Sequence, residues 1–164
     1  MRMLFLIDQL NSGGAQRQLV NLALGLSRKG HVIEFFVYHP QDFFARQLRE
    51  AGIKIHHHYK TSRFSIDIIF SLLDLIKKSD YDCIISFLKI PNFYAELIKL
   101  LTAFKKPRLV VSERYCDSFT GIYFQTKTLR QFHRFADYIT VNSHHQRVAL
   151  EKRYTWIRNK ICTI

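Results

Sequence analysis

Residues 3–37 read MLFLIDQLNSGGAQRQLVNLALGLSRKGHVIEFFV, and this stretch decides the fold. Its opening apolar run, Met3–Ile7, predicts a buried strand. Leucine and alanine then recur at helical spacing over Ala15–Arg28, and Gly30 follows as a helix cap. Val32–Tyr38 is β-branched and aromatic, which predicts a second strand. A strand, a helix and a strand in this order form the unit from which parallel sheets are built.

The same alternation continues to the end of the chain. Further strands are expected at 53–57, 83–87, 109–112, 138–142 and 161–164, and further helices at 42–51, 66–78, 91–104, 126–135 and 143–154. Several of these strands are apolar throughout, which is typical of a parallel sheet with helices on both faces. The sequence therefore predicts an α/β, Rossmann-like fold. The helix at 66–78 has apolar residues on most faces, so we expect it to be well buried.

The composition describes one globular domain with a strongly basic surface. The chain has 164 residues, 48% of them hydrophobic, and a formal net charge of +12. Such an excess of positive charge favours nucleic acid, anionic membrane or phosphorylated ligands as partners. No nucleic-acid-binding motif is present. The three cysteines, Cys83, Cys116 and Cys162, are far apart and odd in number, which suits a reducing cytoplasm.

A pair of glycines, Gly13 and Gly14, lies between the first predicted strand and the first predicted helix. Helix N-termini offer free N–H groups and a positive dipole end, and glycine lacks the Cβ that would keep an anion away. The spacing matches neither a dinucleotide fingerprint nor a Walker loop. Two interpretations stay open at this point: contact with a phosphate, and a tight turn without a ligand.

Ligands of open parallel sheets bind outside the carboxyl ends of the strands. The loop after the strand at 109–112 begins Ser112, Glu113, Arg114, and the strand at 83–87 ends at Phe87, followed closely by Lys89. Topology therefore gathers these groups on the same edge of the sheet as the two glycines.

Four stretches, in order, resemble the family 4 retaining glycosyltransferases of the GT-B fold. The stretches are SGGAQRQLVNLALGLSRKGHVIEFF, DCIISFLKIPNFYAELI, PRLVVSERY and ADYITVNSHHQRVALEKRYTWIRNKICTI. The first is similar to the family's strand, Gly-Gly turn and helix, and the second to its D-[IV]-[IV]-x-S strand. The third is similar to the VxSER segment of a sugar-polymer subgroup, and the fourth to the family's AD…NS…KI run. The resemblance spans nearly the whole chain.

The resemblance implies a protein of two Rossmann-like halves with a cleft between them. In the family, the N-terminal half mainly receives the acceptor, and the other half holds a nucleotide sugar. The chain stops at Ile164, where family members enter the second half. We therefore expect residues 1–164 to form a single acceptor-side domain, inactive without the donor-binding domain. The implied substrates are a UDP-linked sugar and a surface-glycan or lipid-linked oligosaccharide acceptor, with no cofactor and no metal.

The resemblance also implies roles for residues at the expected site. Gly13 and Gly14 would approach the donor diphosphate. Many members carry a histidine in the loop that here reads Ser112-Glu113-Arg114, so no catalytic histidine carries over. Glu113 and Arg114 are the catalytic candidates, with Arg114 pairing with a phosphate and Glu113 contacting a sugar hydroxyl. The alternative for these two residues is a buried Glu–Arg pair that holds a loop.

The acceptor-side candidates lie on the loops after two strands. They are Ser112, Phe87, Lys89 and Tyr115. Tyr115 stands where the subgroup often has asparagine, which leaves the acceptor open. A separate feature, His56-His57-His58, would place two imidazoles on one face of a strand, but a strand end without metal is favoured because no carboxylate or cysteine is close in sequence.

Basic residues flank aromatic ones along part of the surface. They are Lys60, Arg63, Lys77, Lys78, Lys99, Lys105, Lys106 and Arg108, beside Phe64, Phe70, Tyr94 and Phe104. This pattern suits an amphipathic surface lying on anionic lipid, and a solvated charged surface is the alternative. We expect a cytoplasmic protein bound peripherally to the inner face of the cytoplasmic membrane.

Two other functions fit the same pattern. One is a non-catalytic subunit of a split glycosyltransferase that docks on a membrane or a partner. The other is half of a sugar-nucleotide epimerase, which would act without an acceptor. Fold similarity alone does not separate them.

Overall fold

The computed structural model describes residues 1–60, 65–102, 106–114 and 128–164. Its strands form one sheet in the order β3-β2-β1-β4-β5-β6-β7, and every neighbouring pair is parallel. The strands are β1 (Arg2–Leu6), β2 (Val32–Val37), β3 (Lys54–His57), β4 (Cys83–Phe87), β5 (Arg108–Glu113), β6 (Tyr138–Val141) and β7 (Ile161–Thr163). The helices are α1 (Gly14–Arg28), α2 (Ala45–Glu50), α3 (Ile66–Lys78), α4 (Lys89–Thr102), η2 (Gln131–Phe135), α6 (His144–Arg153) and η3 (Thr155–Ile157). The predicted α/β class is confirmed.

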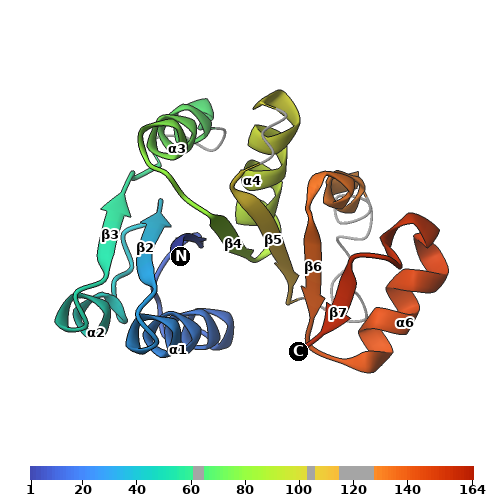
Figure 1. The fold of residues 1–164 in the computed structure, drawn as a ribbon, viewed down its shortest axis with the longest axis horizontal. Helices are drawn as coiled ribbons and strands as arrows, with labels where there is room; N and C mark the ends of the chain where they lie inside the picture. The colour runs from blue at the N-terminus through green and yellow to red at the C-terminus, as the bar shows by residue number, and fades with distance from the viewer. Residues whose placement is uncertain (61–64, 103–105, 115–127) are drawn as a thin grey trace.

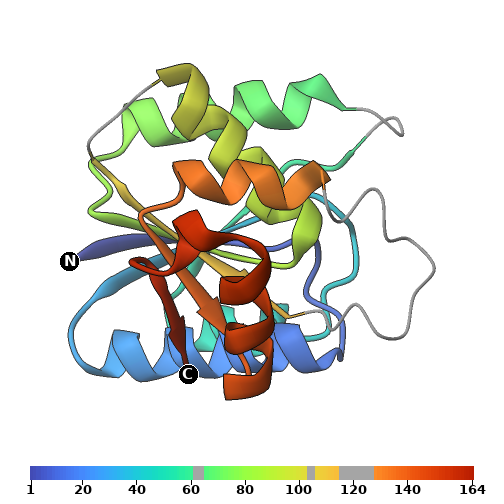
Figure 2. The ribbon, with the colours of Figure 1, turned by 90° about the vertical axis from the view of Figure 1, so that its right-hand side faces the viewer.

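Helices cover both faces of the sheet (Figure 1). The helices α1 and α2 pack on one face, α3 and α4 on the other, and α6 contacts β6 and β7. Turned by 90°, the molecule shows α1 below the sheet and α3 and α4 above it (Figure 2). Along β1, Leu4 and Leu6 pack on the α3–α4 side, whereas Phe5 and Ile7 pack on the α1–α2 side. Burial on both faces is the reason that β1 is apolar from Met3 to Leu6.

Most predicted elements form within a few residues of their predicted ends. Gly30 and Gly52 both have positive φ, and each follows the end of a helix, as the sequence indicates. The helix α2 is shorter than expected, because it begins at Ala45 rather than at Asp42. The predicted helix at 126–135 begins outside the described residues. Its described part is helical at 128–130 and continues as the 3₁₀ helix η2.

The expectation that α3 is well buried is wrong. Its buried residues, Ile68, Leu72 and Ile76, are four apart and form one stripe against the sheet. Ile66 and Phe70 remain 64% and 66% exposed. These two side chains face solvent because the sheet covers only one side of the helix, whereas Ile69, Leu73 and Leu75 are partly buried at its flanks. Among the described helices, none combines the length and the hydrophobicity needed to cross a bilayer.

The strand order changes direction between β1 and β4. The chain runs from β1 outward through β2 to β3, then returns to β4 on the other side of β1. At such a switch point the loops after two neighbouring strands diverge and leave a crevice at the carboxyl edge of the sheet. We call the edge formed by the carboxyl ends of β1, β4, β5 and β6 the rim.

Candidate functional site

Two glycines on the rim have different roles in the structure. Neither has a positive φ, so backbone conformation does not require glycine at either position. A Cβ at Gly13 would lie 2.3 Å from Oε1 of Gln16, whose side chain folds back over the turn. A Cβ at Gly14, the first residue of α1, would meet nothing within 4 Å. The space beside Gly14 is therefore open to a molecule that approaches the N-terminus of α1.

A carboxylate that sequence reasoning missed holds this loop. Asp8 follows β1 directly, and its Oδ1 accepts hydrogen bonds from the Gln9 N–H at 2.8 Å and from Gln16 Nε2 at 3.4 Å. Its carbonyl oxygen accepts from the N–H groups of Tyr38 and His39. Burial raises the pKa of Asp8. The only sequence signal for it is its place as the first polar residue after a buried strand.

The loop after β4 contains a strained residue. Leu88 has a φ of +76°, a conformation that costs a non-glycine residue on the order of 1–3 kcal/mol. It separates the buried Phe87 from Lys89, which is half-buried and begins α4. The strain allows β4 to turn into α4 within one residue, so Phe87 and Lys89 both lie at the rim. No sequence pattern identifies a leucine in this conformation.

Ser112 lies inside the protein rather than on the surface of the rim. Its side chain is fully buried, and its Oγ accepts a hydrogen bond from Thr140 Oγ1 at 2.7 Å. Its carbonyl oxygen accepts from Asn92 Nδ2 at 3.0 Å. These contacts join β5 to β6 and to α4. The proposed acceptor contact of Ser112 stays a prediction, and its hydroxyl already has a partner in this structure.

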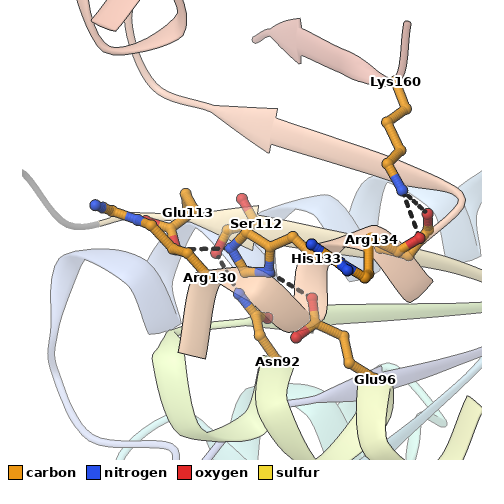
Figure 3. Close-up of polar contacts among 9 residues, drawn as sticks. Asn92, Glu96, Ser112, Glu113, Arg130, His133, Arg134 and Lys160 are labelled. Carbon is orange, nitrogen blue, oxygen red and sulfur yellow. Dashed lines mark hydrogen bonds and ion pairs between the residues drawn. The ribbon is translucent and has the colours of Figure 1, made fainter. Parts of the chain in front are cut away.

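Glu113, the last residue of β5, belongs to a buried charge cluster of four residues (Figure 3). The cluster consists of Glu96, Glu113, Arg130 and His133, which are 0%, 5%, 4% and 3% exposed. Arg130 Nη2 donates to Oε2 of Glu113 at 2.9 Å. The two ring nitrogens of His133 contact Glu113 Oε1 at 2.8 Å and Glu96 Oε1 at 2.5 Å.

His133 and Glu113 keep their charges at neutral pH. Although burial disfavours an imidazolium, Glu96 and Glu113 raise the pKa of His133 to about 10. Burial also opposes the Glu113 carboxylate, but His133 and Arg130 lower its pKa to about 2. Burial raises the pKa of Glu96. Because both ring nitrogens of His133 face carboxylate oxygens, a proton lies between the ring and each of them.

The prediction that Glu113 contacts a sugar stays a prediction. Both of its carboxylate oxygens are occupied inside the protein, by Arg130 and His133. The alternative, a buried pair of Glu113 with Arg114, does not form: Glu113 pairs with Arg130, and Arg114 contacts Phe87 and Asn142. The sequence analysis did not identify His133, which contacts Glu113 beside Arg130. It lies 20 residues after Glu113 in a segment without a motif.

Arg114 carries a positive charge to the rim. Its guanidinium lies 4.2 Å from the centre of the Phe87 ring and donates a hydrogen bond to Asn142 Oδ1. Phe87 ends β4 and Asn142 follows β6, so Arg114 spans the ends of three neighbouring strands. Partial burial lowers the pKa of Arg114 but leaves the guanidinium charged. Tyr115, the next candidate, lies outside the described residues.

The histidine run does not converge on a metal. His56 Nε2 contacts Glu34 Oε2 at 2.6 Å, whereas His58 Nε2 contacts Asp67 Oδ2 at 3.1 Å. The two rings therefore have different carboxylate partners. Within the described residues, no three histidine, cysteine or acidic side chains are grouped as metal ligands.

The described rim offers groups that bind anions and hydroxyls. They are a guanidinium at Arg114, an exposed amide at Asn142 and the open N-terminus of α1 beside Gly14. A guanidinium and helix N–H groups stabilise phosphate oxygens. Such groups can stabilise a negative charge on a bound ligand.

Comparison with known proteins identifies the family of the chain. The model of Glycosyltransferase Family 4 matches residues 12–164. The chain is 28% identical over 160 residues to a Campylobacter jejuni protein, GalNAc-alpha-(1->4)-GalNAc-alpha-(1->3)-diNAcBac-PP-undecaprenol alpha-1,4-N-acetyl-D-galactosaminyltransferase. The match covers 93% of this chain and 43% of that protein, so the chain spans less than half the length of this curated relative.

Solved structures share the fold at lower sequence identity. HepE from Anabaena, solved with UDP and glucose, superposes with a TM-score of 0.76 at 16% identity, over 100% of this chain and 44% of that one. The UDP-GlcNAc 2-epimerase of Neisseria meningitidis, bound to UDP-GlcNAc, superposes with a TM-score of 0.70 at 14% identity, over 99% of this chain and 46% of that one. At these identities the likeness shows the fold alone. The match over residues 12–164 confirms the family that the four sequence stretches indicate, and the chain belongs to Glycosyltransferase Family 4.

Proposed function

We propose that residues 1–164 form the acceptor-side domain of a retaining glycosyltransferase that transfers a sugar from a UDP-sugar to a glycan or lipid-linked oligosaccharide. One observation carries the proposal: the open backbone at Gly14 and the guanidinium of Arg114 share the rim of a family 4 chain. Both groups suit a diphosphate, which is the leaving group of a nucleotide sugar.

In the proposed reaction, the bond between the anomeric carbon and the diphosphate oxygen breaks. The acceptor oxygen forms the new bond on the same face of the sugar, and its hydroxyl proton leaves with the departing phosphate. Arg114 and the N-terminus of α1 would stabilise the negative charge that grows on the diphosphate. The rest of the rim would hold the acceptor hydroxyl against the anomeric carbon.

The substrate classes follow from the relatives. The Campylobacter protein is named for an acceptor glycan on undecaprenyl diphosphate and for transfer of N-acetylgalactosamine. HepE was solved with UDP and glucose. We extend these classes to this chain: a UDP-linked hexose or N-acetylhexosamine as donor and a glycan on a lipid diphosphate as acceptor.

The proposed acceptor places the protein at a membrane, and α3 supplies a surface for it. Ile66 and Phe70 are exposed on α3 beside an apolar groove of about 340 Å³. The groove is lined by Lys60, Ser65, Ile66, Ile69, Ile90, Phe93, Tyr94 and Leu129. The +12 net charge of the chain complements anionic lipid. We place this surface on the inner face of the cytoplasmic membrane.

Not all predicted basic residues are available to lipid. Lys78 pairs with Asp74, and Lys106 with Asp82, while Lys99 and Arg108 both pair with Asp137. Four of the predicted residues, Arg63, Phe64, Phe104 and Lys105, lie outside the described residues. The proposed contact therefore depends chiefly on apolar side chains of α3 together with Lys60 and Lys77.

Two rival functions predict different products. An epimerase half shares the fold, as the Neisseria structure illustrates, and would convert a UDP-sugar without an acceptor. A non-catalytic docking subunit would bind lipid, but without its catalytic partner chain it would release no UDP.

The test compares UDP release with and without an acceptor. The protein produced from its own reading frame is incubated with UDP-linked hexoses and N-acetylhexosamines, in the presence or absence of glycans on a lipid diphosphate. Acceptor-dependent UDP release supports the proposal. UDP release or epimerisation without an acceptor contradicts it. Residues 1–164 alone are expected to be inactive, and turnover by that piece would refute the assignment as one half of the catalyst.

A further inference from the structure

The buried charge cluster lies directly behind the rim cation. Glu113 and Arg114 are consecutive residues at the end of β5, and their side chains have different surroundings. The Glu113 carboxylate is enclosed by Arg130 and His133, while the Arg114 guanidinium lies over Phe87 and bonds Asn142. Burying four ionisable groups is costly, and well-packed apolar residues often serve stability equally well. The cluster therefore requires an explanation besides stability.

The cluster fixes the end of β5 from two directions. Arg130 and His133 belong to the segment 128–135, and Glu96, the second partner of His133, lies on α4. Asn92, one helical turn before Glu96, also donates to the carbonyl oxygen of Ser112. The last two residues of β5 are thus tied to α4 and to the segment 128–135, two of the elements that pack on this side of the sheet (Figure 3).

The place of Arg114 depends on that anchor. Its guanidinium must reach over Phe87 on one neighbouring strand and to Asn142 beyond the other. A long arginine side chain has many rotamers, so its backbone must be fixed if the guanidinium is to stay in one place. Misplacement of a binding group by about 1 Å is enough to weaken a site strongly.

We propose that His133 and Arg130 are positioning residues: by holding the Glu113 carboxylate inside the protein, they fix the end of β5 and thereby place Arg114 to bind a substrate diphosphate. The inference rests on the proposed function, because it needs Arg114 to contact a diphosphate. That group occurs both in a nucleotide sugar and in a lipid-linked acceptor.

The chain contains a matched control for the cluster. His56 Nε2 contacts the buried Glu34 at 2.6 Å, and Glu34 also accepts from Arg2 and Tyr81. This second acid–base cluster involves β1, β2 and β3 on the far side of β1 from Arg114. Replacing its histidine therefore removes a partly buried contact with a buried carboxylate without touching the β5 anchor.

The test is a double-mutant cycle on ligand affinity. Calorimetry on the protein from its own reading frame measures binding of UDP in one arm and of geranyl diphosphate in the other. The variants are H133Q, R114Q, the H133Q/R114Q pair and the control H56Q. We expect H133Q and R114Q each to weaken binding about tenfold, the effect of one charge-assisted hydrogen bond. The double variant should bind no more weakly than R114Q alone, and H56Q should bind like the wild type.

The arms and variants separate the possible failures. If R114Q weakens binding but H133Q does not, or if their effects add, this inference is wrong and the role of Arg114 stands. If R114Q leaves both probes unaffected, the diphosphate role of Arg114 fails, and this inference fails with it. If R114Q weakens the binding of UDP, Arg114 binds the diphosphate of the nucleotide sugar. If it weakens the binding of geranyl diphosphate, Arg114 binds the diphosphate of the lipid-linked acceptor. If H133Q does not fold, the isosteric E96Q replaces it in the same cycle, with a smaller loss expected and the same non-additivity required.

Discussion

Replacement of His133 by glutamine should destabilise the protein more than replacement of any partly exposed histidine. The ring makes two ionic hydrogen bonds, at 2.8 Å to Glu113 and at 2.5 Å to Glu96, and is 3% exposed. Each such bond contributes about 1.5–3 kcal/mol, and removing one partner of a buried ion pair costs about 3–5 kcal/mol. We therefore expect H133Q to lose about 3–5 kcal/mol in free energy of unfolding.

The control is H56Q. His56 makes one contact with Glu34, its side chain is 21% exposed, and Glu34 keeps Arg2 and Tyr81 as partners. We expect H56Q to lower the free energy of unfolding by about 1 kcal/mol. Urea unfolding followed by circular dichroism measures both variants against the wild type. A cost below about 1 kcal/mol for H133Q would show that the cluster does not hold this part of the fold.

The same residue gives a signed dependence on pH. The pKa of His133 rises from 6.5 to about 10 on folding, so its stabilisation is fully present below pH 6.5 and is lost as pH rises through about 10. The groups that face it are Glu96 and Glu113, with Arg130 beyond Glu113. The stability difference between wild type and H133Q should therefore shrink at alkaline pH. A difference that stays constant to pH 10 would contradict a charged His133.

Three further predictions concern the rim, α3 and the amino-terminal ends of the strands. Gly14→Ala should gain about 0.5 kcal/mol in stability, because alanine restricts the unfolded chain and its Cβ meets no atom in the folded one, yet it should raise the KM for a UDP-sugar about tenfold. Gly13→Ala should lose stability, because its Cβ would clash with Gln16. Equal KM values for wild type and Gly14→Ala would refute close approach there. Ile66→Ser with Phe70→Ser should lower binding to phosphatidylglycerol vesicles about tenfold or more at unchanged stability, and unchanged sedimentation with vesicles would exclude α3 as the membrane surface. Asp137→Asn should lower the free energy of unfolding by about 2 kcal/mol at neutral pH. Burial opposes the charge of Asp137, but hydrogen bonds from Leu109, Lys99 and Arg108 lower its pKa, so the stabilisation by the carboxylate is present above pH 3.8 and is lost in acid. Urea unfolding at neutral and at acidic pH measures it.

The layout of the fold could be predicted from the sequence because burial leaves a direct signature. A strand such as β1, covered on both faces, is apolar at every position from Met3 to Leu6, and helices between such strands repeat their leucines at helical spacing. The exposed side of α3 could not be predicted in the same way. Its sequence is apolar on most faces, and only the position of the sheet decides that Phe70 faces solvent.

The rim was predictable in location but not in geometry. Parallel topology brings Gly14, Phe87 and Arg114 to one edge, whatever their side chains do. Whether Glu113 points outward or inward depends on His133 and Arg130, which are distant in sequence and carry no motif. The positive φ of Leu88 depends on how β4 meets α4, and a leucine gives no local sign of it.

The most direct test of the account is the effect of one arginine on sugar transfer. Initial rates of acceptor-dependent transfer are measured for wild type, R114Q and the control R46Q, whose arginine is exposed on α2 and pairs with Glu50. We expect R114Q to lower kcat/KM about 100-fold, as loss of a charge-stabilising donor does, while R46Q matches the wild type. Equal transfer by R114Q and wild type would contradict the claim that the rim of this domain stabilises the diphosphate.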